Sequence, residues 1–180
     1  MGVSAAGKST VGTALAAALG APFLDADGLH SDANRAKMNA GTPLTDEDRR
    51  PWLDTVGGRF AAASETGLVM ACSALRRVYR DRIRAAAPAV VFVHLHGSRD
   101  LLASRAEART DHFMPASLLD SQLRTLEDLE PDEAGFEVTV DRAPEELVDE
   151  IVAQLRADAT PTDASPSGAR AAAGSGARRA

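Results

Sequence analysis

The first chemically informative residues of the chain form a glycine-rich loop at its amino end. The segment GVSAAGKS, residues 2–9, fits the pattern G-x-x-x-x-G-K-[ST]. Glycines allow tight turns whose amides face phosphate oxygens, the lysine reaches the β- and γ-phosphates, and the last hydroxyl binds Mg²⁺. The pattern predicts an ATP site with Lys8 as a catalytic residue and Ser9 as a metal ligand. The predicted phosphate-binding residues are Gly2, Val3, Ser4, Ala5, Ala6, Gly7, Lys8, Ser9 and Thr10.

A helix is predicted to follow this loop. Apolar residues recur at helical spacing, at Val11, Ala14, Leu15, Ala18 and Leu19. Gly20 then supplies a helix stop. Such a helix aims its positive end and its free amides at a phosphate. A loop of this type normally lies between a buried strand and a helix, so we expect the first, central strand of the sheet to be missing from this sequence.

Two carboxylates come directly after the next apolar run. Asp25 and Asp27 follow the predicted short strand at residues 22–24, and His30 comes three residues later. Ligand sites of parallel α/β folds lie beyond the carboxyl ends of the strands. One carboxylate there can hold Mg²⁺ through water, and the other can accept the proton of an attacking hydroxyl. We assign these roles to Asp25 and Asp27; the alternative is a polar turn in which an aspartate caps the next helix.

Composition favours a small enzyme of one domain. The 180 residues are enough for a sizeable core, and a net charge of −6 argues against binding nucleic acid by general charge attraction. The single cysteine, Cys72, is expected to be a small buried residue and suits a reducing, cytoplasmic location. The longest apolar run, residues 85–93, is far shorter than the roughly 20 residues of a membrane span.

Short apolar runs alternate with helical stretches along the chain. Further strands are predicted at residues 68–72, 89–95 and 136–140, and helices at 46–64, 74–87, 98–109, 115–126 and 144–156. This alternation predicts an α/β fold, a parallel sheet covered by helices on both faces. The domain is expected to span residues 1–156. Residues 157–180 lack large apolar side chains, which predicts a disordered low-complexity tail.

Four motifs in this order give a specific resemblance. They are LDADGLH, NRAKMNAGTPLTDEDRRPWL, ACSALRRVYRDRIR and HFMPASLLDSQLRTLE. With the phosphate loop, they resemble the small bacterial-type P-loop gluconokinase family, whose fold is related to shikimate kinase. The resemblance covers roughly residues 1–156. It implies a three-layer sandwich and ATP-dependent, Mg²⁺-dependent phosphorylation of D-gluconate to 6-phospho-D-gluconate, which feeds the pentose phosphate pathway.

Gluconate is an anionic polyol, so its site needs a cation and several hydrogen-bonding groups. Arg49 offers a bidentate fork for a carboxylate, with Arg50 as the other candidate and a salt-bridged helix start as the alternative for both. His30, Asn34 and Lys37 offer further donors. The complete predicted substrate set is Asp27, His30, Asn34, Lys37, Arg49, Ser73 and Arg76, with Arg77 as the alternative to Arg76.

The segment around residues 98–126 is the expected lid. Arg105 and Arg109 are four residues apart on one helical face, and the resemblance implies that they cover the ATP phosphates as catalytic residues; a surface ion pair with Glu107 is the alternative. Gln122 either contacts the substrate or holds the lid. Residues 141–144 are expected near the adenine. By contrast, Tyr79, Arg80 and Arg84 are expected to face solvent or a neighbouring helix.

Three other readings stay open. The chain could act on another acid, such as a shikimate-like acceptor; it could bind nucleotide without turnover; or it could be a truncated product. Ala5-Ala6 stands where the family favours a Ser/Gly pair, which is tolerable unless residue 6 needs positive φ. The family pattern has a methionine before this glycine, so we expect Met1 to be an internal methionine of a longer protein. A homodimer is possible, and no nucleic-acid or membrane partner is expected.

Overall fold

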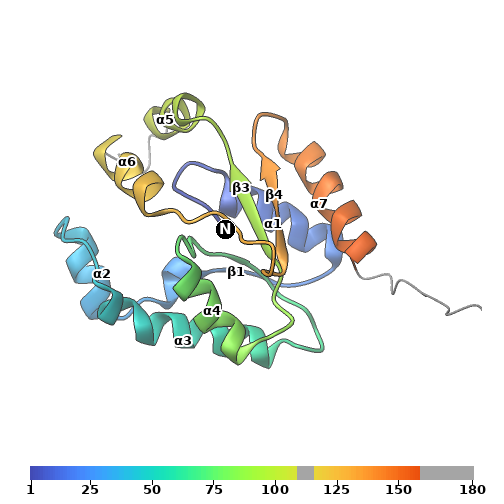
Figure 1. Cartoon of the computed structure of the whole chain (residues 1–180), viewed down its shortest axis with the longest axis horizontal. Helices are drawn as coiled ribbons and strands as arrows, with labels where there is room; N and C mark the ends of the chain where they lie inside the picture. Colours follow the sequence, from blue (N-terminus) through green and yellow to red (C-terminus); the bar gives the residue numbers. More distant parts are fainter. Residues whose placement is uncertain (109–115, 159–180) are drawn as a thin grey trace, which may run out of the picture.

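The strands form two parallel pairs. The computed structural model describes residues 1–108 and 116–158. Strand β1 (Phe23–Asp25) pairs with β2 (Val69–Ala71), and β3 (Phe92–His96) pairs with β4 (Gly135–Thr139). Phe23 lies opposite Val69, and Phe92 opposite Gly135. Figure 1 shows the amino terminus between the two pairs.

Helices cover both faces of these strands. They are α1 (Lys8–Leu19), the 3-10 helix η1 (Ala26–Leu29), α2 (Asp32–Asn39), α3 (Asp46–Ala62), α4 (Arg77–Ala86), α5 (Arg99–Glu107), α6 (Ala116–Thr125) and α7 (Pro144–Asp158). Helix α1 packs against α7, and α3 packs against α4 (Figure 1). The predicted α/β architecture, parallel strands between two helical layers, is confirmed.

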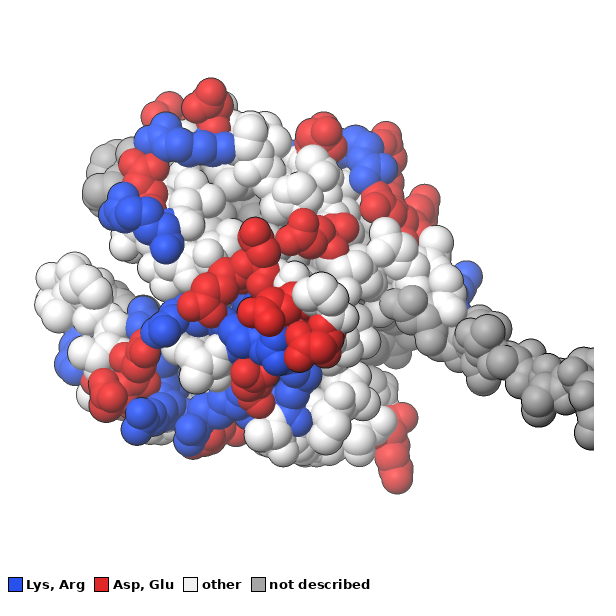
Figure 2. All heavy atoms as spheres, in the orientation of Figure 1, with Lys and Arg blue, Asp and Glu red and all other residues white. Residues whose placement is uncertain are grey.

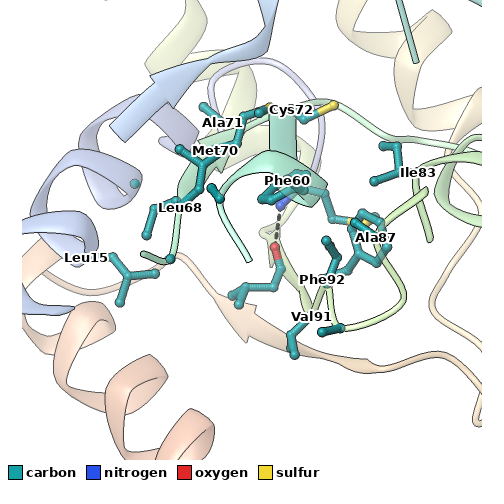
Figure 3. Close-up of a pocket in the computed structure, with 18 of the residues that line it drawn as sticks. Leu15, Phe60, Leu68, Met70, Ala71, Cys72, Ile83, Ala87, Val91 and Phe92 are labelled. Atoms are coloured by element: carbon teal, nitrogen blue, oxygen red, sulfur yellow. Dashed lines mark hydrogen bonds between the residues drawn. The ribbon is translucent and has the colours of Figure 1, made fainter. Parts of the chain in front are cut away.

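Each face has its own apolar core. On the side of α1 and α7, Leu15, Val138 and Ile151 are buried together. On the side of α3 and α4, Val56 and Ile83 are fully buried within a second cluster. Apolar side chains therefore pack against the strands from both helical layers, as in parallel sheets (Figure 3).

The predicted strands and helices are of the correct type, but helix α2 and the 3-10 helix η1 were not predicted. Helix α2 was not predicted because it has only one large apolar residue, Met38, and therefore no apolar periodicity. Met38 is exposed in the structure. The Ser31 side chain accepts a hydrogen bond from the amide of Asn34 and caps α2. A serine at this position was the signal in the sequence that could have indicated the start of the helix. Strand β3 begins at Phe92 rather than at residue 89.

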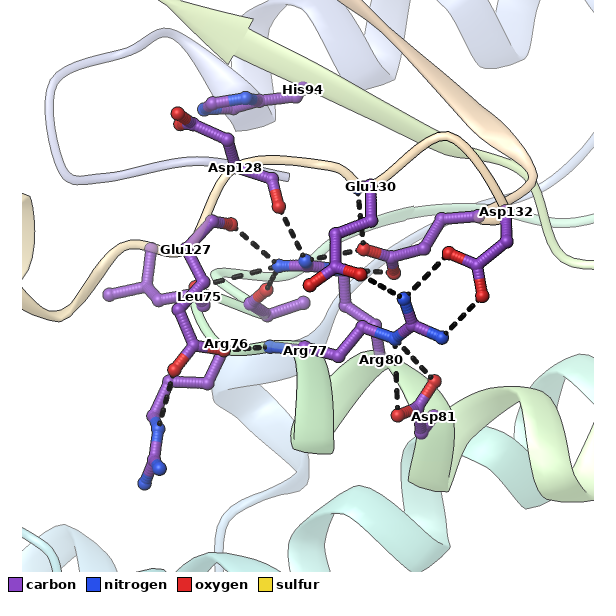
Figure 4. Close-up of polar contacts among 12 residues, drawn as sticks. Leu75, Arg76, Arg77, Arg80, Asp81, His94, Glu127, Asp128, Glu130 and Asp132 are labelled. Carbon is purple, nitrogen blue, oxygen red and sulfur yellow. Dashed lines mark hydrogen bonds and ion pairs between the residues drawn. The ribbon is translucent and has the colours of Figure 1, made fainter.

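Arg80 is wholly buried, contrary to the expectation that it faces solvent or a helix. Its Nε and Nη2 donate to the two carboxylate oxygens of Glu133 at 2.7 and 2.6 Å, and both side chains are 0% exposed. Arg80 also donates to the carbonyls of Glu127 and Asp128 at 2.9 and 3.0 Å (Figure 4). Helix α4 is thereby tied to the segment that leads into β4.

The Glu133 carboxylate stays ionised in this environment. Burial alone raises its pKa, but hydrogen bonds from Arg80 and from the amide of Glu130, together with the Arg80 charge, lower it to about 2. Around this pair, Arg77 binds Asp81, Glu130 and Asp132 at the surface. Figure 2 accordingly shows basic and acidic side chains interleaved on this face.

Two predicted segments lie partly beyond the described residues. The lid at 98–126 includes α5 and α6, but residues 109–115 between them are outside. The tail at 157–180 is outside from residue 159 onward. Over residues 1–108 and 116–158, no helix combines the length and apolarity that crossing a bilayer requires.

Candidate active site

The phosphate loop occupies the start of α1. Gly7 is the N-cap of α1 with φ 86° and makes no side-chain cap bond, so the first amides of the helix are left for a ligand. Gly2 has φ 135°, and a Cβ there would approach the Leu95 carbonyl oxygen to 2.5 Å, so glycine is required. Residue 6 does not have positive φ, but Ala5 does, at 62°. The left-handed conformation costs alanine about 1–2 kcal/mol.

Ser9 and Asp25 lie in contact, although they come from different elements. The Ser9 hydroxyl donates to Asp25 Oδ2 at 2.8 Å. Asp25 ends β1, and its Oδ1 accepts from the Asp27 amide at 3.1 Å, which caps η1. Asp25 therefore caps the next helix, as the alternative prediction had it. Its other oxygen, Oδ2, points to the start of α1, where Lys8 lies. The Lys8 Nζ donates to the Val3 carbonyl at 2.9 Å.

Asp27 reaches solvent beside this pair. Partial withdrawal from water raises its pKa above the ordinary value, and the negative charge of Asp25 adds to the shift, while Lys8 and His30 oppose it. A carboxylate with a raised pKa is a better proton acceptor. Asp27 thus has the electrostatics of a general base next to a phosphate loop.

A hollow of about 260 Å³ adjoins the loop on its other side. Its lining combines loop residues with the two segments that follow β3 and β4: Ala5, Ala6, Gly7, Thr10, Val11, Arg105, Arg142, Pro144 and Leu147. Arg105 donates to the Val140 carbonyl at 2.7 Å. The segment at 141–144, predicted near the adenine, supplies Arg142 and Pro144 to this hollow. No ion pair between Arg105 and Glu107 is found in the described part of the chain. Arg109 lies outside the described residues.

The residues after η1 form a compact polar group. The His30 ring stacks on Trp52, with ring centroids 4.4 Å apart, and the Trp52 Nε1 donates to the Ala26 carbonyl at 2.7 Å. Asn34 donates to the Asp48 carbonyl at 2.8 Å and lies 3.4 Å from His30 Nδ1. Burial lowers the pKa of His30, with Arg49 and Arg35 adding to the effect, and Asp27 opposes it. Trp52 is buried in the core on the α3 side and also fixes the orientation of the His30 ring.

The cationic side chains predicted to bind the substrate, on what we call the acceptor side of the site, all contact other groups of the protein. Lys37 binds both carboxylate oxygens of Asp48 at 2.7 and 2.8 Å. Arg49 donates to the Leu44 carbonyl at 2.6 Å and lies over the Tyr79 ring at 5.7 Å. Its contact with Asp46 is longer, at 3.8 Å. Arg50 is 61% exposed, so of the two arginines Arg49 points inward.

Arg76, rather than Arg77, lies beside Arg49. It donates to Asp46 at 2.6 Å, and the Tyr79 hydroxyl donates to the other Asp46 oxygen at 2.5 Å. Hydrogen bonds from Tyr79 and then from Arg76 lower the pKa of Asp46. Arg77 is occupied by the surface carboxylates in Figure 4. The backbone of Ser73 accepts from the Gly2 amide at 3.2 Å, which brings this segment to the phosphate loop.

Asp46 was not singled out by sequence reasoning, and Gln122 was named there with its role left open between a substrate contact and a contact that holds the lid. Gln122 of α6 accepts from the Ser4 amide at 2.6 Å, so the lid helix touches the phosphate loop. Asp46 organises Arg49, Arg76 and Tyr79. It lies in the first turn of α3 after the N-cap Thr45, and a capping pattern alone does not reveal that Asp46 also faces α4.

Comparisons with known proteins identify the family of the chain. The sequence model of the family described as shikimate kinase matches residues 4–156. The gluconokinase of Gluconobacter oxydans (strain 621H) is 44% identical over 160 residues, covering 88% of this chain and 90% of that protein. A crystal structure of a gluconokinase from Sinorhizobium meliloti 1021 is 49% identical, with a TM-score of 0.81, and the match covers 88% of this chain and 90% of that one. The chain belongs to the gluconokinase family.

The wider relationship of this gluconokinase-family chain is one of fold. The shikimate kinase of Aquifex aeolicus is only 18% identical, with a TM-score of 0.55 over 88% of this chain and 95% of that one. The expected fold, that of the P-loop kinases related to shikimate kinase, is thereby confirmed, as is the family that the four motifs indicated.

Proposed function

We propose that this chain transfers the γ-phosphoryl group of ATP to the terminal hydroxyl of D-gluconate, giving 6-phospho-D-gluconate. The observation that carries the proposal is the grouping of Ser9, Asp25 and Asp27 at the carboxyl end of β1 and the start of α1. A phosphoryl-transfer site needs backbone amides that can bind phosphate, a pair of oxygens that can bind a metal ion, and a carboxylate of raised pKa. Membership of the gluconokinase family supports gluconate as the acceptor.

The donor set fits a magnesium ion. Mg²⁺ prefers oxygen ligands, keeps several waters, and binds through one or two carboxylates plus substrate phosphates. The Ser9 hydroxyl and Asp25 Oδ2, 2.8 Å apart, supply such oxygens beside the helix start. When bound, the ion would neutralise charge on the phosphate oxygens. Lys8 and the first amides of α1 supply positive potential to the same group.

The acceptor is proposed to lie over Asp27, between η1 and α3. Asp27 orients the terminal hydroxyl and accepts its proton. His30, kept neutral by burial, and Asn34 offer hydrogen bonds to the hydroxyls, while Lys37, Arg49, Ser73 and Arg76 supply the remaining contacts. Arg49 and Arg76 lie over the same Tyr79 ring, at 5.7 and 5.5 Å, so two guanidinium groups converge where a carboxylate could bind.

Rate enhancement in this scheme comes mainly from positioning and from stabilising charge. The transfer itself needs little covalent help from the protein. Arg105 lines the hollow beside the loop and is proposed to offset charge on the nucleotide side, with Arg109 in the same role. A cytoplasmic location belongs to the same proposal, since a single cysteine suits a reducing compartment.

Gluconate-dependent ADP release tests the proposal. Lys8→Ala should abolish turnover, because the phosphates lose their cation. Asp27→Asn should lower kcat by about 10²–10⁴-fold, the usual contribution of a general base, and leave ATP binding nearly unchanged. Unfolding should be followed in parallel, so that loss of fold is distinguished from loss of chemistry. A folded chain that releases ADP equally with and without gluconate, or an Asp27→Asn variant of wild-type kcat, would refute the corresponding assignment.

A further inference from the structure

The carboxylate of Asp46 is shared by groups from two helices on the acceptor side. Its Oδ2 accepts from Arg76 Nη1 at 2.6 Å, and its Oδ1 accepts from the Tyr79 hydroxyl at 2.5 Å. Arg49 Nη1 lies 3.8 Å from the same Oδ1. Asp46 belongs to the first turn of α3, and Tyr79 to the first turn of α4. One carboxylate therefore contacts both of the guanidinium groups that we propose to bind the acceptor.

Tyr79 gives this group a rigid base. Its side chain belongs to the buried cluster between α3 and α4. The guanidinium carbons of Arg49 and Arg76 lie 5.7 and 5.5 Å from the centroid of its ring. Burial raises the pKa of Tyr79, and its bond to Asp46 adds to the effect, so the hydroxyl stays protonated and donates. Because the ring is packed in the core, it holds the Asp46 carboxylate in place without help from a ligand.

The other cations of the acceptor side have carboxylates of their own. Lys37 donates to both oxygens of Asp48, at 2.7 and 2.8 Å. Arg77 contacts three surface carboxylates. Glu127 Oε1 lies 3.4 Å from Arg76 Nε, but the same carboxylate accepts from the Arg77 amide at 2.5 Å, as Figure 4 shows. The charge of Glu127 is thus divided between Arg76 and the start of α4.

Arg49 and Arg76 together carry more positive charge than Asp46 balances. Hydrogen bonds from Tyr79 and then from Arg76 lower the pKa of Asp46, so its carboxylate is ionised at neutral pH. Within residues 1–108 and 116–158, the hydrogen bond that Arg49 makes goes to the Leu44 carbonyl at 2.6 Å. A guanidinium has several further N–H donors. Arg49 therefore keeps both donors and charge for a ligand.

We propose that Asp46 is a positioning residue that also determines specificity: it holds Arg76 beside Arg49 and cancels one of their two charges, so that the site favours a carboxylate monoanion over a dianion. The inference rests on the proposed function, because it takes the two arginines as the site of the acceptor carboxylate. A monoanion balances the remaining positive charge. A dianion adds a second negative charge beside Asp46, and this repulsion lowers its affinity.

Two probes that differ in charge at one end test this proposal. D-Gluconate carries a carboxylate at C1, and D-glucitol 1-phosphate carries a phosphate ester at C1 of the same carbon chain. The second pKa of such an ester is about 6, so it is a dianion at about pH 8. Calorimetry with the full chain gives the dissociation constant of each probe. Competition with gluconate shows whether the ester occupies the same site.

Asp46→Asn removes the charge but keeps an oxygen for the Tyr79 hydroxyl. The ratio of the two dissociation constants should move about tenfold in favour of the ester, the effect of one unit of charge at about 6 Å near a protein surface. A loss of positioning alone weakens both probes equally and cancels in this ratio. Tyr79→Phe should show that behaviour: it removes one hydrogen bond, weakens both probes by about fivefold and leaves the ratio unchanged.

Asp54→Asn is the matched control. Asp54 is also a carboxylate of α3 that pairs with an arginine of α4, Arg82, at 2.6 Å. Its loss should change neither dissociation constant. An equal shift of the ratio in Asp46→Asn and Asp54→Asn would overturn the proposal, because any carboxylate between the two helices would then serve.

The remaining outcomes are also decisive. An unchanged ratio in Asp46→Asn overturns the proposal, and so does an ester that gluconate does not displace from this variant. If Asp46→Asn does not fold, Asp46→Ser, which also offers an uncharged oxygen, must give the same shift; loss of the fold in both variants means a structural role and overturns the proposal. Gluconate that binds without gluconate-dependent ADP release refutes the proposed function alone, since the ratio still tests Asp46.

Discussion

The Gln122 side chain of α6 accepts a hydrogen bond from the Ser4 amide of the phosphate loop, at 2.6 Å and across 118 residues of sequence. Beyond the end of the same helix, the Glu127 carboxylate accepts from the Arg77 amide, and its Oε1 lies 3.4 Å from Arg76. Helix α6 and the residues after it therefore connect the proposed phosphate loop with the segment of Arg76, which is proposed to face the acceptor.

Gln122→Ala should impair use of ATP without unfolding the protein. One hydrogen bond is worth about 1 kcal/mol, or about fivefold in an equilibrium constant, so KM for ATP should rise by about that factor. Gln122→Glu should be worse, because a carboxylate beside the loop repels phosphate. Steady-state kinetics gives both values. Gln154→Ala is the control, since the side chain of Gln154 donates to Glu150 within α7. ATP kinetics unchanged in both Gln122 variants would show that the bond has no role.

The buried pair of Arg80 and Glu133 should dominate the stability of the acceptor side. Arg80→Met leaves the buried Glu133 carboxylate with Arg84, at 3.0 Å, as its cationic partner. Removing one partner of a buried pair costs about 3–5 kcal/mol, and urea denaturation should show a loss toward the lower end of that range. Adding Glu133→Leu should recover only part of it, because the carbonyls of Glu127 and Asp128 stay unbonded. Arg82→Met removes an exposed pair with Asp54 and should leave the midpoint nearly unchanged. Equal midpoints for Arg80→Met and Arg82→Met would contradict this reading.

Trp52 should report the protonation of His30. It is the only tryptophan in the chain, and the His30 ring stacks on it. A protonated imidazole quenches indole fluorescence on contact, so emission should fall as the pH drops. Burial lowers the pKa of His30, so the midpoint should lie below the ordinary 6.5. His30→Gln should abolish the transition, and a midpoint at or above 6.5 would be inconsistent with a buried ring.

The buried Met1 amine should make stability rise with pH between about 5 and 8. In that range the unfolded amine, with its ordinary pKa of 8.0, is protonated, and the folded one, lowered to about 5, is not. The unfolded state therefore binds more protons, and the free energy of unfolding increases with pH by at most roughly 4 kcal/mol. His30 and His94 act in the same direction only at lower pH, near and below 6.5.

Acetylation of the Met1 amine is the control for this pH dependence, because it leaves nothing to titrate. Urea midpoints measured at several pH values should keep their dependence below 6.5 in the acetylated chain and lose it between 6.5 and 8. Identical pH profiles with and without acetylation would show that the amine is not buried in solution.

The type and order of the elements could be predicted from the sequence because they depend on local patterns. The phosphate loop fits a short motif, and the apolar residues of α1 and α7 repeat at helical spacing. Helix α2 was missed because it packs little apolar surface, and Arg80 was misplaced because burial of a charge depends on a distant partner. Nothing near Arg80 in the sequence identifies Glu133, 53 residues away, as that partner.

For the site, the sequence by itself determined which residue types are available: the loop amides, Lys8, Ser9 and the carboxylates that follow β1. Only the tertiary structure decided which of them meet. It joined Ser9 to Asp25, turned Arg49 inward and Arg50 outward, and gave Asp46 three cationic or hydroxyl neighbours. The physical reason is that a motif such as the phosphate loop is encoded by a few consecutive residues, whereas contacts and desolvation depend on how separate elements pack.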